Sequence, residues 1–344
     1  MQYEQLTLFP LSENNKLKND LQNEKQVDPI SWKMAEEFEI QDLPFLGCDF
    51  DVVYPKIRKI IPKERVTFEE FKLDNAILCE TICAGICHQI NWDYLRKQIY
   101  NKTKITPQWL APDNLLVITE EDVFNILSTY EKKERIRAKE RRDIIRSIGE
   151  WVKKNNGIRN VFFDNNKLIL DYGTIHNNIF SCEVFSKDPQ EKKLQLLIQK
   201  LSTFEQMKEL SKFYHPAVDY HLIRNYLRRG LIYPRTKYAE KYIKNNFIER
   251  QEKTVAAIRM HCSCMLNEIS LYTGLDVSEI NLIEWHIGRS VCTQEKADCK
   301  LKSENAQWLK PVFSKCPFYN TCLARSGNQE YLKIQEPKYN GISY

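Results

Sequence analysis

Residues 283–322 read IEWHIGRSVCTQEKADCKLKSENAQWLKPVFSKCPFYNTC and hold four of the chain's 11 cysteines, Cys292, Cys299, Cys316 and Cys322. Their pattern is C-x6-C-x16-C-x5-C, in a polar stretch without the apolar periodicity of a self-supporting helix or strand. Clustered thiols in a chain without an export signal more often bind metal than form disulfides. The stretch therefore predicts a loop organised around a covalently held centre.

The cysteine spacing bears on the kind of centre. Four thiolates suit either tetrahedral zinc or an iron–sulfur cluster. Structural zinc sites usually bring two pairs with about two to four residues between partners, whereas the outer pairs here enclose six and five residues. These wider loops favour a [4Fe-4S] cluster, with zinc the less favoured alternative and unligated thiols a third. By contrast, Cys79, Cys83 and Cys87 recur every four residues in an apolar run, so we expect small buried side chains on one helix face.

The composition is that of a folded protein. Of the 344 residues, 42% are hydrophobic and 28% are charged, and there are only 10 glycines and 13 prolines. These values argue against wholesale disorder and against collagen-like, linker-dominated or turn-dense all-β chains. The net charge of +5 permits nucleic-acid binding without indicating it. The chain has no 18-residue apolar run and no leader in which a basic region precedes an apolar one, so we expect a cytoplasmic protein without a membrane segment.

Three regions are expected along the chain. Residues 1–28 are polar and rich in lysine, asparagine and glutamate, which predicts a flexible tail. Residues 29–190 carry amphipathic helical segments and, between 158 and 185, short β-branched and aromatic runs that predict a small β hairpin. Residues 191–344 carry further helices, among them YHLIRNYLRRG, which ends at Gly230. The predicted fold class is mostly α.

Two segments of the chain jointly resemble a known family. One is AVDYHLIR at 217–224, and the other is IEWHIGRSVC at 283–292, which opens the cysteine stretch. Together they resemble the iron–sulfur branch of the helix-hairpin-helix DNA glycosylase superfamily, the endonuclease III and MutY type. In that branch a V-D-x-H-x-x-R segment carries the catalytic aspartate, and a helix that ends G-R-x-x-C opens a C-x6-C-x2-C-x5-C loop. The outer cysteine spacings match here, and the middle one is longer.

The resemblance implies a two-lobed helical fold with a C-terminal [4Fe-4S] cluster loop, and it assigns catalysis to Asp219. Cleavage of an N-glycosidic bond builds positive charge on the sugar, which a nearby carboxylate stabilises while it orients or deprotonates the attacking water. Taken alone, the segment around Asp219 favours this residue as the N-cap of the following helix. With the cysteine stretch beside it, catalysis is favoured, and the two roles are compatible.

The chain departs from the superfamily where the hairpin should precede the aspartate. The hairpin pattern is L-P-G-V-G, followed in bifunctional members by a lysine, but no glycine occurs here between Ser202 and Gly230. The stretch FEQMKELSKFYHPAVDYH stands there instead. It is similar to the queuosine-salvage N-glycosylases, relatives of the same fold that cleave a 7-deazaguanine base from a nucleotide and lack the cysteine cluster. Because Lys200, Lys208 and Lys212 have no hairpin context, we expect a monofunctional hydrolase without a Schiff-base step.

Residues around Asp219 are predicted to contact the substrate. His215 and His221 flank the aspartate in sequence, and Tyr220 occupies the D-Y-x motif of the salvage enzymes. For the two histidines, a structural role is the alternative.

A base-extrusion element is predicted at the end of an apolar helix. The sequence ICHQINW at 86–92 resembles the superfamily's I-x-x-Q segment, whose glutamine enters the space left by an extruded base. Gln89 would then be the wedge and Trp92 a stacking wall, because extrusion from a duplex needs groups that offset the lost stacking. Core packing is the alternative for Trp92.

A short apolar island interrupts the N-terminal tail. Residues Gln5, Leu6, Leu8 and Phe9 belong to the pentapeptide QLTLF, which resembles the Q-L-x-L-F motif by which bacterial repair and replication proteins bind the sliding clamp. An extended peptide of this kind places two apolar anchors in a hydrophobic cleft. Packing of these residues on the chain's own domain is the alternative.

The sequence thus predicts a monomeric DNA glycosylase that hydrolyses a modified or damaged base from its sugar and leaves an abasic site. A phage-type or 7-deazaguanine modification is compatible with the salvage resemblance, and so are repair and anti-phage defence. One alternative is a nucleoside or nucleotide N-glycosidase that acts on a free small molecule. The other is a non-catalytic iron–sulfur protein that binds DNA.

Overall fold

The computed structural model describes residues 38–40, 49–63, 66–188, 190–244, 252–326 and 329–334. These residues are mostly helical, as predicted, and none of their helices is long and apolar enough to cross a membrane. They form two compact units. The middle unit lies within residues 63–217, and the terminal unit joins residues 38–62 to residues 218–334.

The middle unit is almost entirely helical. Its elements are α4 (Leu73–Ile86), α5 (Trp92–Ile105), η2 (Pro107–Leu110), α6 (Pro112–Val117), α7 (Glu120–Leu127), η3 (Lys133–Arg135), α8 (Ala138–Lys154), α9 (Arg159–Phe162), β2 (Phe163–Asp164), β3 (Lys167–Leu168), α10 (Tyr172–Phe180), α11 (Glu183–Ser186), α12 (Lys192–Leu201) and η4 (Glu205–Phe213).

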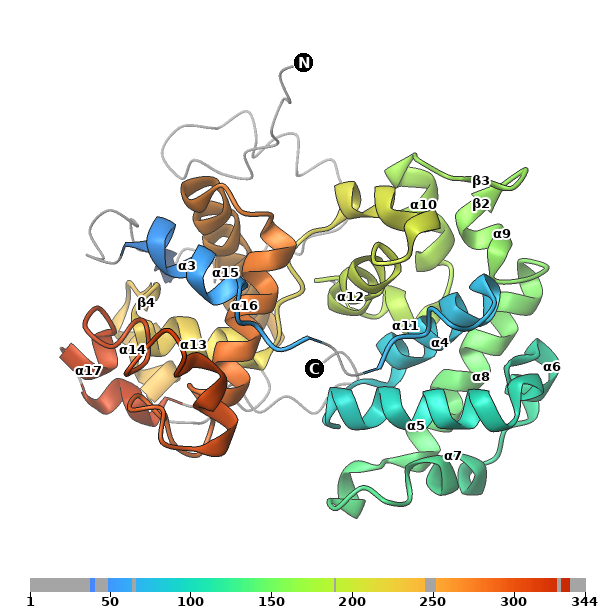
Figure 1. Ribbon diagram of the computed structural model, residues 1–344, viewed down its shortest axis with the longest axis horizontal. Coiled ribbons are helices and arrows are strands. Elements are labelled where there is room, and N and C mark those ends of the chain that lie inside the picture. The colour runs from blue at the N-terminus through green and yellow to red at the C-terminus, as the bar shows by residue number, and fades with distance from the viewer. Residues whose placement is uncertain are drawn as a thin grey trace. The chain divides into compact units, whose positions relative to one another are not determined.

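Helix α4 is the centre of this unit. Helices α5, α8 and α12 all pack on it (Figure 1), and every residue from Ala76 to Ile86 is buried. The sequence predicted a single apolar face for this helix, but neighbours cover its whole circumference. Cys79 and Cys83 are accordingly fully buried, and the more exposed Cys87 donates its thiol to the Ala84 carbonyl.

A small hairpin lies within the stretch where the sequence predicted one. Strands β2 and β3 pair antiparallel, with Phe163 opposite Leu168. The β-branched run that follows is helical instead, as α10 and α11. Asp171 caps α10 by accepting the N–H of Thr174 at 2.8 Å, which starts a helix where composition alone suggested a strand.

The terminal unit combines segments from both ends of the described chain. Its elements are β1 (Phe38–Ile40), α3 (Phe50–Arg58), α13 (Tyr220–Arg229), β4 (Ile232–Pro234), α14 (Lys237–Lys244), α15 (Glu252–Thr273), α16 (Val277–Ser290), η5 (Glu304–Leu309), α17 (Leu323–Ser326) and η6 (Gln329–Lys333).

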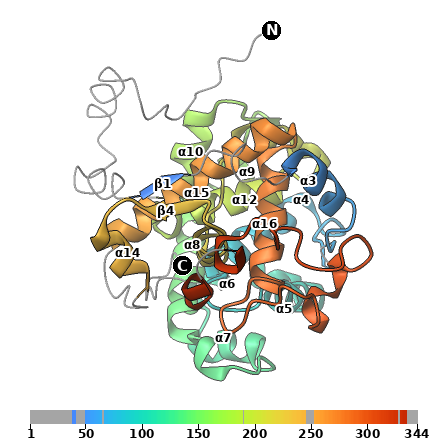
Figure 2. The ribbon, with the colours of Figure 1, turned by 90° about the vertical axis from the view of Figure 1, so that its left-hand side faces the viewer.

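The early segment joins this unit by pairing and packing. Strand β1 pairs antiparallel with β4, and Figure 2 shows both strands along α15. Helix α3 packs on α15 and α16 through Phe50, Tyr54 and Ile57, which share one helix face and are buried.

The observed units therefore differ from the predicted regions 29–190 and 191–344. Besides the early segment, helix α12 departs from the prediction, because its buried Leu194, Leu197 and Ile198 belong to the face that packs on α4 in the middle unit. The division falls between Ala217 and Val218, at the first residue of the predicted catalytic segment.

Candidate active site

Asp219 begins helix α13 as its N-cap residue, with extended backbone at φ −121° and ψ −178°. Its Oδ1 accepts hydrogen bonds from the backbone N–H groups of His221 at 2.8 Å and Leu222 at 3.3 Å. A capping side chain satisfies the first N–H groups of a helix in this way. The predicted capping role is confirmed, and Asp219 is only 6% exposed.

The other carboxylate oxygen of Asp219 bonds to helix α16. Trp285 donates its indole N–H to Oδ2 at 3.1 Å. Asp219 thus accepts three N–H donors, which fix the position of a negative charge. Trp285 is absent from the predicted site, because the two residues are 66 positions apart and only the packing of α13 on α16 joins them.

Gly288 allows α13 and α16 to approach closely. A Cβ at this position would lie 2.6 Å from the carbonyl oxygen of His221, nearer than any real side chain. Arg224 of α13 crosses this contact and donates to the carbonyls of Gly288 at 2.7 Å and Cys292 at 2.8 Å. The two segments that carry the family resemblance are therefore in direct contact.

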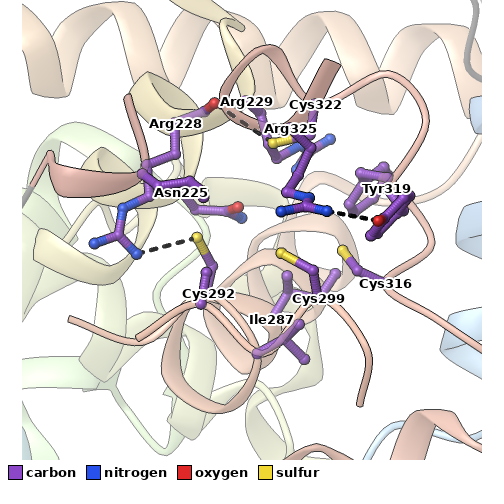
Figure 3. Close-up of a pocket in the computed structure, with 14 residues that line it drawn as sticks. Asn225, Arg228, Arg229, Ile287, Cys292, Cys299, Cys316, Tyr319, Cys322 and Arg325 are labelled. Atoms are coloured by element: carbon purple, nitrogen blue, oxygen red, sulfur yellow. Dashed lines mark hydrogen bonds between the residues drawn. The ribbon is translucent and has the colours of Figure 1, made fainter. Parts of the chain in front are cut away.

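All four predicted metal ligands line one pocket of the terminal unit. We call it the thiol pocket, and Figure 3 shows its four cysteines: Cys292, Cys299, Cys316 and Cys322. The thiol of Cys322 is directed at the backbone carbonyl of Arg228 at 3.5 Å. Within the described ranges, no three His, Cys, Asp or Glu side chains are grouped so that they could hold a metal ion.

The backbone links the cysteines across the long loop. The N–H of Cys316 donates to the carbonyl of Cys299 at 2.9 Å, which closes the 16-residue segment between them. Cys292 forms an antiparallel bridge with Ala297, so the six-residue segment is also folded back on itself. Segments that are polar and aperiodic in sequence are thus held in place by local hydrogen bonds.

Arginine side chains surround the thiol pocket. Arg228 donates to the sulfur of Cys292 at 3.6 Å and to the carbonyl of Thr293 at 2.7 Å. Arg229 and Arg325 also line the pocket. Arg224 and Arg228 are four residues apart, so this part of α13 presents one basic face, a spacing visible in the sequence but not used in the prediction.

Burial disfavours the thiolate form of these cysteines, so a thiolate here needs a positive charge beside it. Burial, together with the charges of Cys292 and Cys322, raises the pKa of the Cys299 thiol to about 11. Burial also raises the pKa of Cys316 well above the ordinary thiol value. Metal ligation requires thiolates, which a metal centre stabilises by its own charge. The four thiols line one pocket with guanidinium groups beside them, but in the described residues they are not grouped as metal ligands, so the cluster stays a prediction.

Tyr220 and His221 lie in the first turn of α13, next to Asp219. Their rings are 4.2 Å apart, and the His221 ring meets Trp285 edge-on at 6.2 Å. His221 Nδ1 is 3.0 Å from an Arg224 guanidinium nitrogen. Both predicted residues are half-buried and in the same unit as the carboxylate.

The remaining predicted substrate residues belong to the middle unit. His215 is exposed, and Gln89 has a left-handed backbone with φ 56°, which is uncommon for a residue other than glycine. Trp92 begins α5, and its ring has the guanidinium of Arg96 at 5.4 Å and the ammonium of Lys200 at 5.6 Å. Their approach to Asp219 stays a prediction.

The predicted clamp-binding residues Gln5, Leu6, Leu8 and Phe9 lie outside the described residues.

Comparison with known proteins assigns no family. No protein-family model matches the chain, and no curated protein matches it. The function of the site is therefore argued from its own chemistry.

Proposed function

We propose that this protein is a DNA glycosylase that hydrolyses the N-glycosidic bond of a modified or damaged base and leaves an abasic site. The observation that carries the proposal is the setting of Asp219. Its carboxylate accepts three N–H donors, is shielded from solvent, and stands at the start of the helix whose arginines line the thiol pocket.

The proposed reaction needs little more than a well-placed carboxylate. As the bond between C1′ and the base nitrogen breaks, the electron pair leaves with the base, and positive charge develops on the sugar. Asp219 stabilises this charge, more strongly because a buried carboxylate acts through a low local dielectric. Oδ2 accepts one hydrogen bond, from Trp285, so a lone pair remains that can orient or deprotonate the water that attacks C1′.

A lyase step is not part of the proposal. Lys208 and Lys212 are exposed and paired with Glu205 and Glu209 on the same 3-10 helix. Lys200 packs beside the Trp92 ring in the middle unit. These lysines have structural surroundings, and the proposed enzyme is monofunctional.

The proposed cofactor is a [4Fe-4S] cluster held by Cys292, Cys299, Cys316 and Cys322. When bound, the cluster would crosslink the loop that follows α16 and stabilise the fold rather than take part in the hydrolysis. Arg228, which donates to the sulfur of Cys292, would face it from α13 and offset part of its negative charge.

The test is base release from DNA by Asp219→Asn and by a matched control. Purified protein is incubated with phage and host DNAs of diverse modification, and released bases are identified by mass spectrometry. Asparagine is itself a good N-cap, so Asp219→Asn should fold and bind DNA but lose base release by about 10²- to 10⁴-fold. Asp276→Asn is the control, because Asp276 precedes α16 without a capping side-chain bond and is exposed.

Two results would contradict the proposal. Wild-type protein that releases no base from any DNA, nucleoside or nucleotide would leave only the non-catalytic DNA-binding alternative. Release from free nucleosides or nucleotides, with none from DNA, would favour the salvage-type alternative. Removal of residues 1–12 adds a partner test: it should weaken action on clamp-loaded DNA, and an unchanged rate there would refute the clamp-binding peptide.

A further inference from the structure

Aromatic rings form a continuous row that begins next to Asp219. We call it the ring row: Tyr220, His221, Trp285, His286 and Trp308. Successive ring centroids lie 4.2, 6.2, 5.0 and 5.9 Å apart. All five side chains are half-buried, so part of each stays accessible to a ligand. The row lies wholly within the terminal unit.

The last ring of the row comes from the long segment between the second and third cysteines. Trp308 lies in η5 and donates its indole N–H to the hydroxyl of Ser290 at 2.9 Å, and that hydroxyl donates to the carbonyl of His286 at 2.6 Å. The segment is anchored beneath by fully buried side chains, those of Leu301, Ala306 and Leu309. Trp308 is therefore held in place by the fold, and it is half-buried rather than fully covered.

The same segment is strongly basic. Residues 300–315 contain four lysines and one glutamate. All four lysines are exposed. On α16, the guanidinium of Arg289 lies 4.8 Å from the Trp285 ring. Partly exposed rings together with cations are the chemistry that binds unpaired nucleic-acid strands, because every base has a face that can stack and every linkage carries a negative charge.

We propose that the ring row and residues 300–315 bind the unpaired DNA strand next to the nucleotide that Asp219 acts on, with Trp308 as an outer stacking residue. The inference rests on the proposed function and adds its substrate form, an unpaired strand rather than a free nucleotide. The long insertion in the cysteine loop then has a role of its own, because it supplies a ring and a charged surface that the four thiols do not require.

The test separates stacking by Trp308 from its packing. Binding of a fluorescently labelled single-stranded oligonucleotide to the full chain is measured by anisotropy for wild type, Trp308→Leu, Trp308→Phe and Val52→Ala. Loss of one stacked base predicts about tenfold weaker binding by Trp308→Leu. Trp308→Phe keeps a ring and should retain most of the affinity. Val52→Ala changes an exposed residue of α3, outside the ring row and residues 300–315, and should bind as wild type does.

A salt series separates stacking by Trp308 from a purely structural role of this residue. If Trp308 stacks on a base, Trp308→Leu lowers affinity at every salt concentration without changing the slope of log affinity against log salt, since phosphate contacts are kept. Equal affinity of Trp308→Leu and wild type would overturn the inference. The inference would also be overturned if Trp308→Phe and Trp308→Leu lost the same affinity and both had a lower melting temperature. That result would show that Trp308 has a packing role.

Failure of the inference and failure of the proposed function are distinguishable. Base release by wild type, with oligonucleotide binding that does not depend on Trp308, would refute only the ring row as a strand-binding surface. Ring-dependent binding without base release from any DNA would refute only the hydrolytic function.

Discussion

The buried carboxylate of Glu284 offers the sharpest test of how the terminal unit is held together. Glu284 is completely buried on α16. It accepts two hydrogen bonds from Arg229, at 2.7 and 2.8 Å, and one from Asn225 at 2.5 Å. The hydroxyl of Tyr54 also donates to it, so this one carboxylate joins α16 to α13 and α3.

Glu284→Gln removes the charge and keeps the shape. Arg229, 5% exposed, would then be a buried cation without its counter-ion, and an amide N–H₂ would face its guanidinium. Loss of one partner of a buried ion pair destabilises a protein by about 3–5 kcal/mol. At about 2–4 °C per kcal/mol for a unit of this size, the melting temperature should fall by roughly 10 °C.

Loss of the Glu284 charge should also destabilise the thiol pocket. The guanidinium of Arg229 lies 3.5 Å from the centroid of the Phe318 ring, two residues after Cys316. If the thiol pocket holds the proposed cluster, Glu284→Gln should lose iron and visible absorbance at a lower temperature than wild type. Both are measured on the same sample as the helical circular dichroism.

Glu279→Gln is the matched control. Glu279 lies on the same helix and pairs with Arg58 at 2.6 Å, but the two side chains are 28% and 54% exposed. An exposed pair contributes about 0–1 kcal/mol, so this variant should melt within a few degrees of wild type. If both variants melt alike, the argument from a desolvated charge is refuted.

Three other perturbations have defined outcomes. Gly288→Ala should destabilise the fold by about 1–3 kcal/mol or more, because its Cβ would meet backbone 2.6 Å away. The control Gly173→Ala, whose Cβ would have no atom nearer than 3.5 Å, should leave the melting temperature unchanged or slightly higher. Equal effects of the two variants on the melting temperature would contradict the close-packing argument. Cys316→Ser should lower the iron content and visible absorbance of purified protein, whereas Cys264→Ser, outside the thiol pocket, should not; retained iron in Cys316→Ser would exclude it as a ligand. Burial lowers the pKa of His88 from 6.5 to about 4, so the folded chain favours neutral imidazole, and that stability is lost as pH falls from 6.5 toward 4. His88→Gln should therefore flatten the melting temperature against pH in this window, and an unchanged slope would refute the assignment.

Local signals in the sequence predicted local structure well. The helix YHLIRNYLRRG ends at Gly230, whose φ of 77° is the left-handed conformation expected at a helix C-terminus. Asp219 caps the same helix as predicted. Such features depend on residues two to five positions apart, whose geometry is nearly the same in any fold.

The apolar periodicity of the sequence could not predict contacts between segments far apart in the chain. The full burial of α4 depends on which helices surround it, and an apolar run of that length fits one buried face or all of them. The three-residue strand β1 is too short to be recognised, and it forms because β4 supplies a partner. Its pairing places the early segment in the terminal unit, against the predicted division.

By itself, the sequence determined which chemical groups this protein has: a capping aspartate, four spaced thiols and a mostly helical chain. Only the tertiary structure decided what those groups meet. Trp285 reaches Asp219 across 66 residues, and Arg229 reaches Glu284 across 55. The physical reason is that a cap needs only its own helix turn, whereas a contact between helices depends on where every intervening apolar face finds burial.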